Sequence, residues 1–145
     1  MPLRKAFMNF SLLNILPYLG TLPFVLGTFA KMSDTLPMIY FMDTRRIVLS
    51  YGVLIISFMA GVHWGQYLSG MRGKLNLLIT SNVIALVAWI SGLLLLPTHI
   101  CYVLIVLFAL LYMIDRGLEI PTAYLQTRRN VTLIVCACLL ALSFA

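Results

Sequence analysis

Five apolar stretches separated by short polar segments set the strongest limit on how this chain can fold. They cover about residues 7–28, 47–69, 75–96, 100–114 and 125–145. A helix of about 20 apolar residues can cross the hydrocarbon core of a bilayer, and backbone inside lipid must satisfy its own hydrogen bonds. We therefore predict an all-α polytopic membrane protein, with residues 1–145 forming a single domain that is a bundle of five transmembrane helices.

The composition supports the membrane class. Hydrophobic residues make up 62% of the 145 positions and charged residues only 10%, whereas soluble domains are roughly 45–50% apolar. In a soluble domain the net charge of +6 would suggest nucleic acid as a partner. Here the basic residues sit at the ends of the apolar stretches, where they contact lipid headgroups. We expect the lipid bilayer as a partner and no nucleic acid.

The basic residues also predict an orientation. With five spans, the side of the amino terminus holds seven Lys and Arg residues and the opposite side holds three: Arg4, Lys5, Arg72, Lys74, Arg116, Arg128 and Arg129 against Lys31, Arg45 and Arg46. Because cytoplasmic loops are enriched in Lys and Arg, we place the amino terminus in the cytoplasm and the carboxyl terminus outside. No transit-like leader precedes the first span, so we expect the bacterial inner (cytoplasmic) membrane.

Prolines predict a kink in the first span. Pro17 and Pro23 each remove a backbone donor and displace the carbonyl four residues earlier. The freed carbonyls could coordinate a solute, or neighbouring helices could satisfy them.

The connecting segments give three local predictions. Residues 36–42 are apolar and aromatic, which favours a short helical turn lying in the membrane interface. Asp43 is placed to cap the second helix. Pro97-Thr98-His99 predicts a minimal hairpin into the fourth span.

The second span has two distinct faces. Small residues recur every fourth position and form a ridge suited to close helix packing: Ser57, Gly61, Gly65 and Ser69. His63 and Gln66 lie on another face. A helix with small residues on one side and polar residues on the other has little surface left for lipid, so we place it centrally in the bundle.

The remaining polar residues give no familiar catalytic arrangement. His63 and His99 differ in depth by roughly 20 Å, too far for a shared metal or haem. Cys101, Cys136 and Cys138 lie within apolar spans and are interpreted as small hydrophobic residues. We therefore assign no catalytic residue, no metal ligand and no cofactor, and we favour a protein that is not an enzyme.

Asp115 follows the fourth span, and we expect it to pair with a cationic side chain. A carboxylate at the carboxyl end of a helix opposes the helix dipole, and Arg128 and Arg129 lie at the same depth. An ion pair that docks two helices is the simpler interpretation, and a proton relay is the alternative. For His63, a hydrogen-bonded packing role and a functional role both stay open; we expect the neutral form, bonded to a neighbouring helix.

The stretch Tyr51–Gly65 starts with Tyr-Gly, contains Ile-Ile-Ser-Phe and ends with Gly-Val-His-Trp-Gly. This pattern is similar to the signature of a family of bacterial and mitochondrial proteins of unknown function that includes transmembrane protein 69. Supporting matches extend over nearly the whole chain: Leu19-Gly20, Pro23-Phe24, Asp115, Tyr124, Arg128 and Thr132. The resemblance implies a five-helix membrane protein and brings no established activity.

Three functions follow from these features. The ridge and the short loops favour an accessory or assembly protein that acts through helix–helix contacts, with a membrane-protein partner or a second copy of itself. The prolines of the first span favour an oligomeric small-solute transporter or channel, as do the polar residues assigned to the cytoplasmic half: His63, Gln66, Arg72, Asp115, Arg116, Arg128 and Arg129. A quinone-, haem- or lipid-binding protein is the third hypothesis. The candidate binding or functional residues are His63, Trp64, Gln66, Tyr51, Asp115 and Arg128.

Overall fold

The computed structural model describes residues 12, 14–35, 38–39 and 42–145. It is an all-α bundle whose five spans are each long and apolar enough to cross a membrane, and the first of them covers Asn14–Met32. The chain is therefore a multi-pass membrane protein, as the sequence predicts. The elements are α2 (Leu22–Met32), β1 (Met38–Ile39), β2 (Met42–Asp43), α3 (Thr44–Leu68), α4 (Leu77–Leu94), α5 (Pro97–Arg116) and α6 (Thr122–Ser143).

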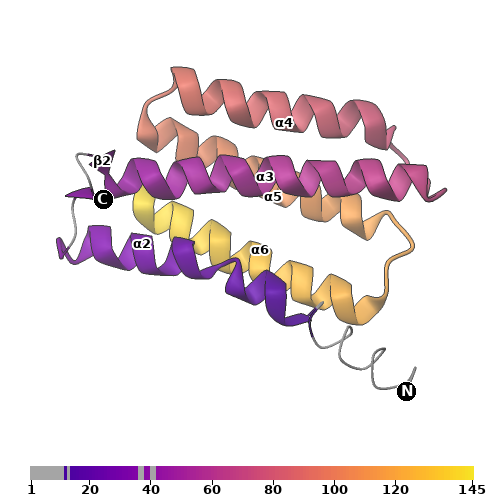
Figure 1. Cartoon of the computed structure of the whole chain (residues 1–145), viewed down its shortest axis with the longest axis horizontal. Coiled ribbons are helices and arrows are strands. Elements are labelled where there is room, and N and C mark those ends of the chain that lie inside the picture. Colours follow the sequence, from indigo (N-terminus) through magenta and orange to yellow (C-terminus); the bar gives the residue numbers. More distant parts are fainter. Residues whose placement is uncertain (1–11, 13, 36–37, 40–41) are drawn as a thin grey trace.

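The first span is interrupted, as its prolines predict. Residues 14–19 are helical, Gly20 and Thr21 form a turn, and α2 begins at Leu22 with Pro23 in its first turn (Figure 1). The carbonyl of Gly20 accepts a hydrogen bond from the Tyr51 hydroxyl, at 3.1 Å. A neighbouring helix thus satisfies one backbone carbonyl at the interruption.

Several boundaries differ from the sequence prediction. The first span ends at Met32 rather than near residue 28, and its predicted start at residues 7–11 lies outside the described residues. Pro97-Thr98-His99 is not a hairpin but the first turn of α5, because proline at the first helical position lacks only a donor that the helix does not use. The connection between α4 and α5 is residues 95–96 alone.

The segment before α3 is a strand pair rather than a helical turn where it is described. Met38 pairs with Asp43 and Ile39 with Met42 in an antiparallel ladder, whereas residues 36–37 and 40–41 lie outside the described residues. The prediction overlooked that β-branched and aromatic side chains favour strands. Asp43 does cap α3, since its carboxylate accepts from the Arg45 backbone N–H at 3.0 Å.

Helix α3 lies at the centre of the bundle. It packs against α2, α4 and α5, and Figure 1 shows it between α4 on one side and α2 on the other, with α5 behind it. Glycines let α2 and α5 come close to α3. A Cβ on Gly27 of α2 would clash with Val48 Cγ2 of α3, and a Cβ on Gly52 of α3 would lie 2.8 Å from Leu104 Cδ1 of α5. Fully buried side chains from four helices fill the interior: Phe24, Ile56, Leu104, Leu111 and Leu139.

The small-residue ridge does not pack within this bundle, which corrects our expectation for α3. Gly61, Gly65 and Ser69 are exposed and Ser57 is half-buried. A Cβ on Gly61 or Gly65 would meet no atom of another helix within 4 Å. The physical reason is His63, which is fully buried on the opposite face: a helix that turns its ionisable residue inward must turn the ridge outward. Contact of the ridge with a second chain stays a prediction.

Candidate functional site

A buried cluster of three ionisable residues joins three helices near one end of the bundle. His63 Nε2 of α3 lies 2.9 Å from Asp115 Oδ1 of α5. The other carboxylate oxygen of Asp115, Oδ2, accepts from Nε and Nη2 of Arg128 on α6, each at 2.8 Å. The three residues are exposed by 0%, 2% and 6%, respectively. Three of the candidate residues from the sequence, His63, Asp115 and Arg128, therefore lie together, and the bond between His63 and Asp115 was not predicted.

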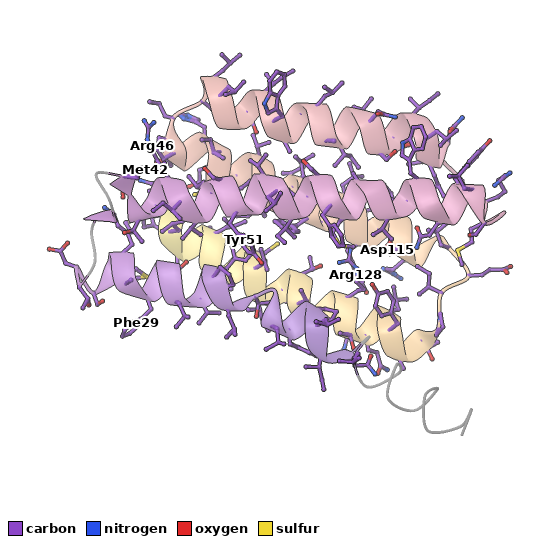
Figure 2. The ribbon with its side chains drawn as sticks, viewed as in Figure 1. Phe29, Met42, Arg46, Tyr51, Asp115 and Arg128 are labelled. Atoms are coloured by element: carbon purple, nitrogen blue, oxygen red, sulfur yellow. The ribbon has the colours of Figure 1, made fainter. Side chains whose placement is uncertain are left out.

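Local structure explains how the chain brings these groups together. Asp115 is the next-to-last residue of α5, and Arg128 lies in the second turn of α6. The connection of residues 117–121 reverses the chain, so both side chains reach the same depth (Figure 2). Asp115 stands at the helix end that the dipole disfavours for an acid, and its pairing with Arg128 offsets that penalty. Arg129 is exposed and is not the partner.

In this cluster the Asp115 carboxylate has a hydrogen-bond donor for each oxygen, whereas one nitrogen of the Arg128 guanidinium has only a weak acceptor. Both oxygens of Asp115 have donors, which is what a buried charge requires. The Arg128 Nη1 group instead donates to the thioether of Met59, at 3.4 Å. A thioether is a weak acceptor, so this nitrogen keeps most of its capacity to bind a stronger one.

Arg128 and Met59 both line an apolar cavity of about 420 Å³. It lies between the first span, α3, α5 and α6, and its polar side chains are Tyr124, Arg128 and Thr132. The other lining residues are Leu16, Pro17, Gly20, Phe24, Ile55, Phe58, Met59, Val62, Phe108, Val131 and Val135. Pro17 and Gly20 belong to the interrupted part of the first span, so the break forms part of the wall.

Two further polar atoms near the cluster are buried without a partner. His63 Nδ1 and Gln66 Oε1 have no hydrogen-bond partner among the described residues. Both belong to α3 and are three positions apart, so they lie on the same side of the helix. Gln66 is therefore close to the site in sequence and depth. Among the described residues, no hydrogen bond joins its side chain to Asp115 or Arg128.

Two of the predicted site residues lie elsewhere. Trp64 is 44% exposed and stands on the outer side of α3. Tyr51 is bonded to Gly20 and lies 5.2 Å from the Phe24 ring, measured between ring centroids. Figure 2 shows Tyr51 farther along the bundle from Asp115 and Arg128. The hypothesis of a ligand held by His63, Trp64 and Gln66 together is thus not supported by their placement.

Met59 and the cavity walls were not predicted, although α6 carried a signal. Tyr124, Arg128 and Thr132 are spaced by four residues, which places them on one face of a helix, and all three line the cavity. The cysteines take no part: Cys101 is buried, and Cys136 and Cys138 are half-buried free thiols. In the described part of the chain, no three His, Cys, Asp or Glu residues are grouped to hold a metal.

Comparison with known proteins gives a family without an assigned activity. A family model described as "Protein of unknown function (DUF3429)" matches residues 11–144. No curated protein and no solved structure matches the chain.

Proposed function

This chain belongs to the family of proteins of unknown function (DUF3429), and on that premise we propose that it binds a lipid-soluble molecule with an apolar body and a hydrogen-bond-accepting head. The observation that carries the proposal is the buried Arg128 at the wall of the apolar cavity, with Nη1 donating only to Met59. Of the functions that the sequence suggests, the geometry supports this one best.

The dimensions and chemistry of the cavity support such a ligand. Its volume of about 420 Å³ falls within the roughly 300–1,000 Å³ of small-molecule sites, which are mostly apolar with a few polar groups that fix orientation. The head, a quinone carbonyl or a carboxylate, would replace Met59 as the acceptor for Arg128 Nη1. A hydrogen bond to a charged donor is stronger than one between neutral groups, so the arginine would fix the position of the head.

Thermal unfolding of the protein in mild detergent tests the proposal. A long-chain fatty acid and a short-chain quinone analogue are compared with an alkane of similar length. We expect the two polar-headed probes to raise the unfolding temperature, because a ligand that binds only the folded state stabilises it. Equal stabilisation by the alkane would show that Arg128 does not contact the head.

Matched variants locate the ligand. Val131 lines the cavity and is not a member of the cluster of His63, Asp115 and Arg128, so Val131→Phe should fill the cavity and abolish the shift in unfolding temperature. Leu133→Phe adds the same ring on the exposed side of the same helix and should leave the shift unchanged. Binding that survives Val131→Phe would place the ligand at another site.

A second function, that of an accessory or assembly protein acting through helix–helix contacts, is favoured by a different observation. Gly61 and Gly65 are exposed on α3 with no neighbouring atom near them, a surface on which another backbone can approach closely in lipid. In this function Gly61→Leu should dissociate a defined dimer or complex and leave the isolated chain folded. Leu86→Phe, on the exposed side of α4, is the control. An unchanged mass in both variants would contradict this role.

We also propose the bacterial inner membrane as the location, with the amino terminus in the cytoplasm, and a relationship to the transmembrane protein 69-like proteins within the family. The unequal distribution of Lys and Arg supports the orientation. Reporter fusions at Lys74 and Glu119 should be cytoplasmic, and fusions at Asp34, Thr98 and the carboxyl terminus should be external. An external Glu119 would be incompatible with this topology.

A further inference from the structure

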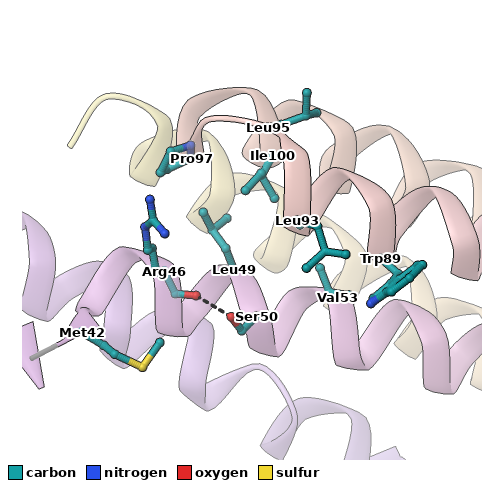
Figure 3. A pocket seen from close by; sticks show the side chains of 11 residues that line it. Met42, Arg46, Leu49, Ser50, Val53, Trp89, Leu93, Leu95, Pro97 and Ile100 are labelled. Atoms are coloured by element: carbon teal, nitrogen blue, oxygen red, sulfur yellow. Dashed lines mark hydrogen bonds between the residues drawn. The ribbon is translucent and has the colours of Figure 1, made fainter. Parts of the chain in front are cut away.

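A second cavity, of about 330 Å³, lies at the opposite end of α3 from the ionised cluster. It is a groove between the start of α3, the end of α4 and the start of α5. Its floor consists of buried Leu49 and Ile100, and Arg46 stands at its rim. Figure 3 shows Arg46 near one end of the groove and Trp89 at the other, with Leu49 and Val53 between them.

Two neighbouring arginines at this end have different roles. Arg45 is bonded to the bundle: its Nη2 donates to Thr98 Oγ1 at 2.8 Å and to the Ser143 carbonyl at 3.3 Å. The guanidinium of Arg46 has no hydrogen-bond or ion-pair partner among the described residues, and its side chain is exposed. Asp43, the nearest acid in the sequence, is paired with Lys31. Arg46 therefore presents a free positive charge beside the groove.

The groove combines this charge with an apolar channel in the orientation of a membrane lipid. Arg46 is the third residue of α3, at the level of the headgroups in a spanning helix. Val53 and Trp89 lie deeper along the same groove, about seven residues or 10 Å towards the membrane centre. An acyl chain runs in this direction from its headgroup.

We propose that this groove is a binding site for one anionic phospholipid, whose phosphate pairs with Arg46 and whose acyl chain lies over Leu49 and Val53 against Trp89. Guanidinium groups bind phosphate through charge-assisted hydrogen bonds. A zwitterionic lipid adds a positive group next to Arg46 and is bound less tightly. The site is independent of the cavity at Arg128, because the two share no lining residue.

Fluorescence quenching by brominated phospholipids tests the proposal directly. The chain has two tryptophans, and the Trp64→Phe variant leaves Trp89 as the sole reporter. In non-ionic detergent, phosphatidylglycerol with brominated acyl chains should quench Trp89 and saturate near one lipid per protein. Brominated phosphatidylcholine should require about tenfold more lipid, because its choline group places a second positive charge beside Arg46.

Variants then separate a specific site from general contact with lipid. Adding Arg46→Gln should weaken phosphatidylglycerol binding about tenfold, Arg46→Lys should weaken it less, and Arg116→Gln, an exposed arginine at the other end of the bundle, should leave it unchanged. The Trp89→Phe protein, which reports only from Trp64, should show no saturable quenching. Equal binding of the two lipids, no effect of Arg46→Gln, or full competition by glycerol phosphate alone would each overturn the proposal.

Discussion

His63 Nε2 lies 2.9 Å from Asp115 Oδ1, although 52 residues separate the two in the chain. This contact ties the end of α5 to α3, and the pairing of Asp115 with Arg128 ties α5 to α6. Three of the five spans are thus joined through one carboxylate. The cluster that borders the proposed ligand cavity is also a structural connection, so the two roles must be separated by experiment.

Breaking the pair between Asp115 and Arg128 should destabilise the protein strongly. Asp115→Leu leaves a buried guanidinium without its carboxylate, and we expect a loss of about 3–5 kcal/mol in the free energy of unfolding. The double variant Asp115→Leu, Arg128→Leu should lose much less, because neither charge is left alone. Denaturation in mild detergent measures both, with Glu119→Gln, an exposed acid, as the control. Additive losses would mean that the two charges do not interact.

Substitution of His63 distinguishes a packing residue from a functional one. In His63→Gln an amide can still donate to Asp115, so we expect a loss of about 1 kcal/mol and an intact fold. His63→Leu offers no donor and should be less stable than His63→Gln. If His63→Gln is as stable as the parent but fails to complement a deletion strain, the packing interpretation is wrong and His63 is functional.

Glycine substitutions should follow the observed packing rather than the sequence pattern. Gly52→Ala places a Cβ 2.8 Å from Leu104, and such overpacking costs about 1–3 kcal/mol. Gly92→Leu should be harmful, because its Cβ alone lies 3.3 Å from Val53 Cγ2. Gly61→Leu and Gly65→Leu should be tolerated by the isolated chain. The yield and unfolding temperature of the four variants test this order; equal losses at Gly61 and Gly52 would contradict it.

Low pH should destabilise the amino-terminal end of α3, which Asp43 caps. Partial burial raises the pKa of Asp43, but the bond from the Arg45 N–H and the ion pair with Lys31 outweigh it, so the pKa is lowered overall. The stabilisation by Asp43 is therefore fully present above the unfolded pKa of about 3.9 and is lost as the pH falls through the folded value. Unfolding temperatures between pH 7 and pH 3 should fall less steeply in Asp43→Asn than in the parent. The same change at exposed Asp34 should have no such effect.

The architecture could be predicted because the bilayer restricts it. An apolar stretch of sufficient length must become a helix, and the five spans follow from that rule. The interruption near Gly20 and the cap at Asp43 could also be predicted from the sequence, because proline and aspartate act on the backbone next to them. The strand pair of Met38–Ile39 with Met42–Asp43 was missed because the strand preference of β-branched and aromatic residues in this segment was overlooked.

The sequence alone could not show which side of each helix points into the bundle. The sequence showed that the small residues and His63 occupy different sides of α3, but only the partner of His63 decides which side is inside. Asp115 had two cations at its depth, and the choice of Arg128 over Arg129 depends on the rotation of α6. Met59 carries no polar signal at all, so its contact with Arg128 is visible only in three dimensions.

Asp115 and its countercharge lie on consecutive helices, which has a consequence for membrane insertion. Arg128 follows Asp115 by 13 residues and lies on the next helix, so a bilayer that received α5 before α6 would hold the carboxylate without its guanidinium. A carboxylate without its cation is expensive in hydrocarbon, which favours insertion of α5 and α6 as one hairpin. Helix α6 thus completes the charge balance of α5, and a chain truncated between Asp115 and Arg128 would leave an acid in the bundle without its cation.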